Sequence, residues 1–212
     1  CLGLAAPLEA PRSLSIPVTG GECMVTAGAA VPISALAFHP DGKTLASGGY
    51  QEVLVWDLEN AKLSNRIGAG QLSGQVRALV FTKDGRSVAV ADGIPGSFGA
   101  VRLLDLETRR VTASFEPAKD EILSLALSPD GKLVAAGGAD ALVRVWSMED
   151  RRAVATLREH GDWVSGVSFS PDGKLLATAS TDKTVQVWEA GTWRPIVRLP
   201  QVLTEPVHGL AF

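Results

Sequence analysis

The chain has 212 residues, of which 46% are hydrophobic and 20% are charged, and its formal net charge is −3. Such a chain is long enough to bury a sizeable core. The small negative charge gives no electrostatic attraction to nucleic acids or anionic membranes, so partners of these two classes are not expected. No apolar run approaches the ~18 residues that a membrane-spanning helix needs.

Residues 1–30 are rich in alanine, proline and glycine and lack the pattern that follows. We expect a linker or the remnant of a processed signal peptide, because a short apolar stretch with small residues precedes the cleavage site in such peptides. A lipidated Cys1 is a third interpretation, which the apolar residues after it oppose. Residues 24–28 are expected to supply an outer strand to a neighbouring sheet. Cys1 and Cys23 define no disulfide framework, so the two cysteines do not indicate the cellular compartment.

From residue 33 onward one block of residues returns four times. The aspartate of its first turn stands at Asp41, Asp84, Asp130 and Asp172, so the steps are 43, 46 and 42 residues. A period of this length, with strand-like runs and no helical pattern, indicates one supersecondary unit that is stacked repeatedly. Because one such unit cannot bury its own apolar faces, the repeat predicts a β-propeller or a related β array.

Each repeat is expected to form a four-stranded antiparallel sheet, and the fourth shows why. Residues 164–169, 174–179, 184–189 and 195–199 have the character of strands, and Ser170-Pro171-Asp172-Gly173 forms the first turn. Proline presets φ, aspartate bonds the backbone ahead, and glycine accepts the left-handed conformation. We therefore expect a positive φ at the turn glycine of every repeat, namely at Gly42, Gly85, Gly131 and Gly173.

The repeats predict blades at approximately residues 33–70, 76–117, 122–159 and 164–204, and the start of a fifth at residues 207–212. The second repeat is longer because residues 93–99 are inserted between its second and third strands, and a segment so rich in glycine and proline is typical of an exposed loop. Since the repeat breaks off within the fifth unit, we expect a fragment that forms an open arc, without contact between its first and last blades. A closed four-bladed ring is the alternative.

These residues resemble the WD-repeat β-propeller family of bacterial type, over roughly residues 31–212. The signature dipeptide is intact once and degenerate in the other three repeats; the four dipeptides are Trp56-Asp57, Leu104-Asp105, Trp146-Ser147 and Trp188-Glu189. The resemblance implies an all-β fold, a β-propeller of four-stranded antiparallel blades. Propellers of this family most often close with seven blades.

The resemblance also implies a hydrogen-bonded tetrad, made in the family by a histidine, a serine or threonine, an aspartate and the signature tryptophan. Only the fourth repeat supplies all four, with either Thr178 or Ser180 as the hydroxyl. The tetrad that we predict is His160, Ser180, Asp182 and Trp188. The third repeat has no histidine, and the first has Gln51 in place of the aspartate, so hydrophobic packing is expected to hold the other blades.

No pattern in the chain predicts catalysis, a metal site or a cofactor. Gly68, Gly70 and Gly74 miss the spacing of a dinucleotide-binding loop and precede no helix. Ser97 lacks the spacing of a hydrolase nucleophile elbow. The three histidines are far apart in the sequence and have no partners at ligand spacing; they are His39, His160 and His208.

We therefore expect a non-catalytic scaffold that binds other proteins through its loops. The residues expected to contact a partner lie in the turns between second and third strands and before the first strands; they are Tyr50, Gln51, Phe98, Glu121, Asp162 and Trp163. The alternative is an accessory propeller region of a larger bacterial enzyme or electron carrier, fused to a kinase or a c-type cytochrome. A hydrolase or small-molecule binder would need polar side chains that converge on the central channel.

Overall fold

The computed structural model describes residues 14–18, 21–25, 32–199, 205, 207 and 209–212. The chain divides into two units, residues 1–32 and residues 33–212. The first unit holds an antiparallel hairpin of β1 (Leu14–Val18) and β2 (Gly21–Val25). Of the outer strand predicted at residues 24–28, Met24 and Val25 pair with β1, and residues 26–28 lie outside the described residues, so the outer strand stays a prediction.

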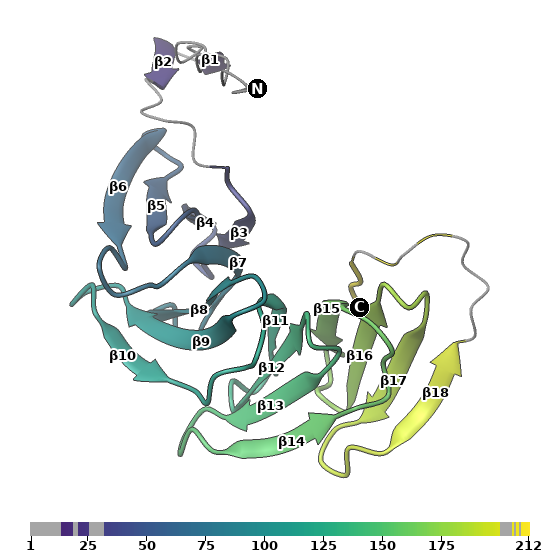
Figure 1. Ribbon diagram of the computed structural model, residues 1–212. Coiled ribbons are helices and arrows are strands. Elements are labelled where there is room, and N and C mark those ends of the chain that lie inside the picture. The colour runs from purple at the N-terminus through teal and green to yellow at the C-terminus, as the bar shows by residue number, and fades with distance from the viewer. Residues whose placement is uncertain (1–13, 19–20, 26–31, 200–204, 206, 208) are drawn as a thin grey trace, which may run out of the picture. The chain divides into compact units, whose positions relative to one another are not determined.

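The described residues of the second unit form four sheets, each of four antiparallel strands (Figure 1). The first two blades are β3 (Ala35–Phe38), β4 (Thr44–Gly48), β5 (Val53–Asp57) and β6 (Lys62–Ile67), then β7 (Gln75–Phe81), β8 (Ser87–Ile94), β9 (Phe98–Asp105) and β10 (Val111–Ser114). The last two are β11 (Ile122–Leu127), β12 (Leu133–Gly138), β13 (Val143–Ser147) and β14 (Ala153–Leu157), then β15 (Val164–Phe169), β16 (Leu175–Ser180), β17 (Val185–Glu189) and β18 (Pro195–Leu199).

The four blades follow one another along an arc, and their innermost strands lie side by side. β3 contacts β7, β7 contacts β11, and β11 contacts β15 (Figure 1). Among the described residues every regular element is a strand, so the predicted all-β fold with four-stranded antiparallel blades is confirmed.

The turn between the first and second strands has the predicted chemistry. In the fourth blade, the Gly173 N–H donates to the Ser170 carbonyl at 2.8 Å, and the Lys174 N–H donates to Asp172 Oδ1 at 3.0 Å. The glycine lies in the left-handed region in all four blades, with φ of 69°, 70°, 75° and 71° at Gly42, Gly85, Gly131 and Gly173. The prediction of positive φ at these four positions is thus confirmed.

The insertion in the second blade is a hairpin extension and not the loop that we predicted. β8 and β9 stay paired as far as Gly93 with Gly99 and Ile94 with Phe98, so only residues 95–97 form the turn. Asp120 of the next blade fixes this turn, because its Oδ1 accepts the Gly96 N–H at 2.7 Å. The glycines allow close approach of neighbouring backbone, and the segment makes a tight turn. A composition rich in glycine and proline does not distinguish such a hairpin from a loop.

Each blade has two apolar faces, because successive side chains of a strand point to opposite sides. We call the face toward the preceding blade the leading face. It carries a row of cross-strand partners in every blade, namely Phe38, Leu45, Trp56 and Leu63; Phe81, Val88, Leu104 and Val111; Leu127, Val134, Trp146 and Ala153; and Phe169, Leu176, Trp188 and Pro195.

The opposite face, which we call the trailing face, presents a smaller set of side chains to the next blade. The set comprises, blade by blade, Val53, Val55 and Ile67; Val101, Leu103 and Phe115; Val143, Val145 and Leu157; and Val185, Val187 and Leu199. Three hydrophobic clusters join the leading faces of blades two, three and four to the trailing faces of blades one, two and three. Each large side chain that is fully buried in this way contributes roughly 1.5–3 kcal/mol.

Gly85 and Gly131 allow a matched test of how one blade touches the next. Their φ values are alike, but a Cβ at Gly85 would lie 2.2 Å from His39 Nε2 of the first blade, whereas a Cβ at Gly131 meets no heavy atom within 4 Å. We expect Gly131→Ala to cost about 1–2 kcal/mol through backbone strain alone. Gly85→Ala should cost more, because His39 must move. Urea denaturation measures both losses, and equal losses would contradict the contact.

Candidate functional site

The fourth blade contains a chain of side-chain hydrogen bonds that crosses β16 and β17. Trp188 Nε1 donates to Thr178 Oγ1 at 3.1 Å, and Thr178 Oγ1 lies 2.8 Å from His160 Nε2. His160 Nδ1 lies 3.2 Å from Asp182 Oδ2. Because an ionised carboxylate can only accept, the proton of a neutral His160 ring lies on Nδ1, and Nε2 accepts the Thr178 hydroxyl. The Thr178 hydroxyl thus accepts from Trp188 and donates to His160, which in turn donates from Nδ1 to Asp182.

The hydroxyl in this network belongs to Thr178, so the choice of Ser180 was wrong. Ser180 Oγ instead donates to the Asp162 carbonyl at 2.9 Å and accepts the Asp182 N–H at 3.0 Å. The reason is strand register, because Leu176 is the cross-strand partner of Trp188. Thr178 is the next residue on that face, and Ser180 lies about 6–7 Å farther along the strand, at roughly 3.3 Å per residue.

Burial and hydrogen bonding set the charges in this network. Burial lowers the pKa of His160 and outweighs the opposing effect of Asp182, so the imidazole is held neutral. Burial acts to raise the pKa of Asp182, but hydrogen bonds from the Thr184 hydroxyl and from the Gly161 and Thr184 N–H groups lower that pKa to about 2. Each partner is satisfied within the blade, and the arrangement is that of a structural brace.

The other blades have different side-chain hydrogen bonds at the position of this network. In the first blade, Trp56 Nε1 donates to Ser47 Oγ at 2.8 Å. Gln51, which stands where the aspartate is expected, donates from its side-chain amide to the Ser73 carbonyl at 3.3 Å. In the third blade, Asp140 accepts two hydrogen bonds from Arg144, at 3.0 and 2.6 Å.

The second blade holds a buried ion pair that the sequence patterns did not reveal. Asp92 is fully buried and pairs with Arg102 on the adjacent strand, and its second oxygen accepts the Ser73 N–H at 2.7 Å. Arg102 also donates to Ser73 Oγ at 3.3 Å. A charged residue within an apolar strand was the one available signal. Removing Arg102 would leave a buried carboxylate unpaired, which is strongly destabilising.

Five of the six residues predicted to contact a partner reach the edge that carries the turns after β4, β8, β12 and β16. We call this edge the upper face. Tyr50 is 55% exposed and Trp163 is 54% exposed. Asp162 is exposed, and Gln51 and Phe98 are half-buried.

Glu121 is the exception, because its side chain is buried and not free for a partner. Its carboxylate accepts hydrogen bonds from Arg77 Nε at 3.1 Å and from Arg77 Nη2 at 3.2 Å. Arg77 lies on β7 and Glu121 directly before β11, so the pair joins the second blade to the third. The sequence did not reveal this pair, because Arg77 lies 44 positions before Glu121. Glu121 was therefore expected to be available to a partner.

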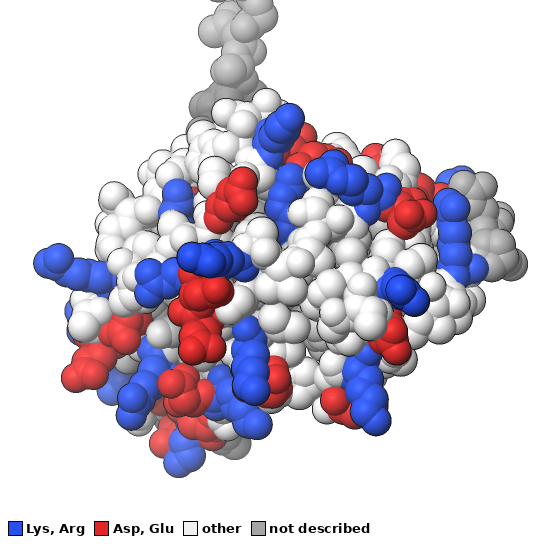
Figure 2. All heavy atoms as spheres, turned by 90° about the horizontal axis from the view of Figure 1, so that it is seen from below, with Lys and Arg blue, Asp and Glu red and all other residues white. Residues whose placement is uncertain are grey.

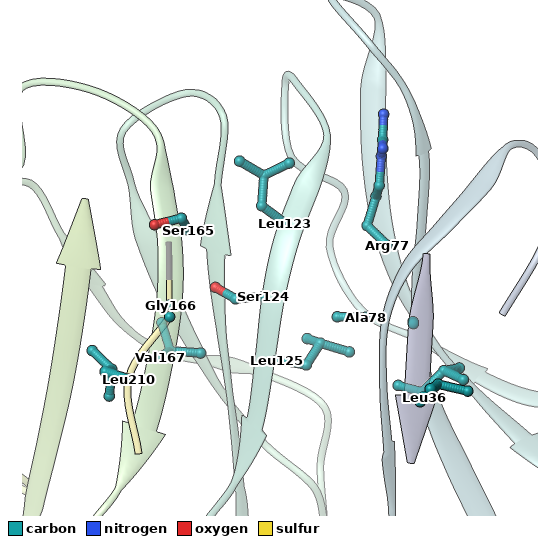
Figure 3. A pocket seen from close by; sticks show the side chains of 13 residues that line it. Leu36, Arg77, Ala78, Leu123, Ser124, Leu125, Ser165, Gly166, Val167 and Leu210 are labelled. Carbon is teal, nitrogen blue, oxygen red and sulfur yellow. The ribbon is translucent and has the colours of Figure 1, made fainter. Parts of the chain in front are cut away.

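The innermost strands enclose a small central cleft of about 260 Å³. Figure 3 shows that leucine side chains and a few polar groups line it. Those polar groups are engaged within the protein, because Ser124 donates to the Val164 carbonyl, Ser165 to the Val207 carbonyl and Arg77 to Glu121. Ligand sites commonly measure roughly 300–1,000 Å³ and present convergent polar groups. The cleft therefore gives no support to a hydrolase or a small-molecule binder.

The described residues contain no group of three or more histidine, cysteine, aspartate or glutamate side chains that could hold a metal ion. Over the same part of the chain, no helix has the length and apolar character needed to cross a membrane.

Replacing His160 by alanine tests the brace in the fourth blade. The change removes the shorter hydrogen bond of the buried Thr178 hydroxyl and one donor to the Asp182 carboxylate, so we expect a loss of about 1–3 kcal/mol. Thermal or urea denaturation followed by tryptophan fluorescence measures the loss. A stability equal to that of the parent chain would show that the network does not form in solution.

Curated relatives include the small ribosomal subunit protein RACK1 of Schizosaccharomyces pombe, 31% identical over 120 residues, which make up 52% of this chain and 36% of that protein. The cross-pathway control WD-repeat protein 2 of Flammulina velutipes is 30% identical over 118 residues, 51% of this chain and 35% of that protein. The chain thus spans about a third of the length of these two relatives.

A third relative is the periodic tryptophan protein 2 homolog of Schizosaccharomyces pombe, 31% identical over 54% of this chain and 13% of that protein. All three come from eukaryotes and give no support to the predicted bacterial type, and the fragment hypothesis stays a prediction. The family model for the WD domain, G-beta repeat, matches residues 21–57, 109–147 and 151–189. Because these stretches cover more than half of the 212 residues, the chain belongs to the WD-repeat family.

Proposed function

We propose that this chain is a non-catalytic scaffold that binds another protein through its upper face. The observation that carries the proposal is the exposure of two large aromatic side chains there, Tyr50 at 55% and Trp163 at 54%. Tyrosine and tryptophan are the usual anchors of protein interfaces, because they bury a large area at a small cost in conformational entropy.

The backbone beneath both aromatic residues is held in place. The Trp163 carbonyl accepts the Thr181 N–H at 2.9 Å, which ties the segment before β15 to the turn after β16. Next to Tyr50, the Gln51 N–H donates to the Gly74 carbonyl of the second blade at 2.8 Å. A side chain on a fixed backbone loses less freedom when it binds, so this arrangement favours recognition.

The distribution of charged side chains does not favour nucleic acid as a partner. On the face seen in Figure 2, lysine and arginine side chains lie interspersed with aspartate and glutamate. Charged side chains of the chain also pair with one another, as Lys43 does with Glu59 at 2.8 Å. Nucleic acid binding calls for a stripe or patch of positive charge. The mixed surface supports a protein partner instead.

The relatives support the same proposal. One of them is named as a small ribosomal subunit protein, and therefore as a component of a larger assembly. None of the three relatives described above is named as a kinase or a cytochrome, so the alternative of an accessory region in an enzyme or electron carrier gains no support.

Substitutions at the upper face and at the opposite edge of the blades test the proposal. The tagged chain is used to capture proteins from its source cells, and the captured protein is then titrated against purified variants. We expect Tyr50→Ser and Trp163→Ser each to weaken binding about tenfold or more, as the loss of an interface anchor does. Lys132→Ser and Arg152→Ser, at the opposite edge, serve as controls and should leave the affinity unchanged. Equal effects at both edges would refute the upper face as the binding surface.

A further inference from the structure

At the edge opposite the upper face, the side chain of His39 joins the first turn of the first blade to that of the second. Its Nε2 donates to the Gly85 carbonyl at 2.9 Å, since a carbonyl oxygen can only accept. The ring also meets Phe81 edge to face, with 5.0 Å between the ring centroids. On its own blade, His39 Nδ1 lies 2.9 Å from a carboxylate oxygen of Asp41. The imidazole therefore fills the space between two neighbouring turns.

The same place between the second and third blades is a cavity of about 280 Å³. Thr82 stands two residues before the turn aspartate, as His39 does in the first repeat, and its shorter side chain leaves the space open. A Cβ at Gly131 would meet no heavy atom within 4 Å, whereas a Cβ at Gly85 would lie 2.2 Å from His39 Nε2. We call this cavity the socket.

The junction of the third and fourth blades is closed in another way. Ser128 takes the position of His39 there, and the next residue, Pro129, lies against the turn glycine, with its Cδ 3.5 Å from the place of a Cβ at Gly173. In the second repeat, Lys83 replaces this proline and also lines the socket. The socket thus lacks both the imidazole of the first junction and the proline ring of the third.

The walls of the socket repeat the surroundings of His39. They include Asp84 and Ser87 at the places of Asp41 and Thr44, and Leu127, Asp130 and Gly131 at the places of Phe81, Asp84 and Gly85. Among the described residues, no N–H group or side chain donates to the Gly131 carbonyl. The acceptor that His39 uses in the first junction is therefore unoccupied in the second.

The two carboxylates of the socket are ionised at neutral pH. Hydrogen bonds from the Thr82 hydroxyl and the Arg86 N–H lower the pKa of Asp84. The Ser128 hydroxyl and the Lys132 N–H do the same for the pKa of Asp130. An ionised carboxylate can only accept hydrogen bonds, so these walls favour a group that donates N–H.

We propose that the socket binds the imidazole ring of a histidine from a partner protein. The ring takes the place that His39 has in the first junction, with one nitrogen donating to the Gly131 carbonyl and the other beside Asp84. Ligand sites commonly measure roughly 300–1,000 Å³. A cavity of about 280 Å³ lies below that range and suits a single side chain. This site lies at the opposite edge, so it does not rest on the upper-face proposal.

Titration of the isotope-labelled 212-residue chain, followed by nuclear magnetic resonance of its amides, tests the socket. The probe is a blocked tripeptide with histidine between two glycines, and the matched peptide with phenylalanine in place of histidine is the control. Free imidazole is titrated separately. We expect the histidine peptide to shift the amide signals of Asp84 and Gly131 with a dissociation constant of about 1–10 mM, as suits so small a contact. The phenylalanine peptide, which has no ring N–H, should not bind.

Substitutions locate the binding. Gly131→Ala places a methyl group where the ring nitrogen would lie, and Thr82→His fills the socket from within, so each should weaken binding at least tenfold. Gly42→Ala is the matched control, because Gly42 has a similar φ of 69° and open surroundings but lies outside the socket. It should leave binding unchanged, as should Tyr50→Ser on the upper face. Circular dichroism checks the fold of each variant.

Several results would overturn the proposal. One is a histidine peptide that shifts neither amide signal, and another is equal binding of the phenylalanine peptide. Undiminished binding by both Gly131→Ala and Thr82→His would place the contact elsewhere. Binding of free imidazole without binding of the peptide would show that the socket takes a small molecule and not a partner's side chain.

Discussion

The packing of each leading row on the trailing face of the preceding blade is the interaction on which the remaining structure depends. A four-stranded sheet with apolar side chains on both faces is not stable alone in water, so each blade needs its neighbours. In the described chain this contact recurs between successive blades, each time between a leading row and the trailing face of the blade before it. The signature tryptophan belongs to this row, and its ring is buried in the third and fourth blades.

The polar networks are secondary to this packing and differ from blade to blade. The fourth blade has the brace of His160, Thr178, Asp182 and Trp188, while the second has Asp92 with Arg102. Each network satisfies the polar groups that the apolar packing buries, and a buried polar group without a partner would be costly. Their variety shows that the blade tolerates different solutions at this place as long as every group is paired.

Tight turns and contacts between blades support the binding surface that we propose. The turn glycines with positive φ close each hairpin tightly, and the pair of Arg77 with Glu121 links neighbouring blades. Exposed aromatic residues such as Trp163 are then held on fixed backbone. The binding that we propose there would rest on shape and apolar contact and would not depend on a strong net charge.

The sequence predicted the features that local chemistry controls, and it missed those that depend on contacts between distant residues. The strands and turn glycines were correct because alternation of side chains and left-handed turns leave a signature within a few residues. Ser180 was chosen over Thr178 because both suit the motif, and only the register against Trp188 separates them. Glu121 was expected at the surface because its partner Arg77 comes from another blade.

Amide hydrogen exchange, resolved by strand, tests most directly whether packing between blades is the dominant source of stability. At a concentration where the chain is monomeric, the account predicts the slowest exchange in β8 and β12, whose blades are covered on both faces. Exchange should be faster in β4 and β16, each in a blade covered on one face. Slowest exchange in β16 would contradict the account, because it would mean that the hydrogen-bonded brace of the fourth blade outweighs the packing between blades.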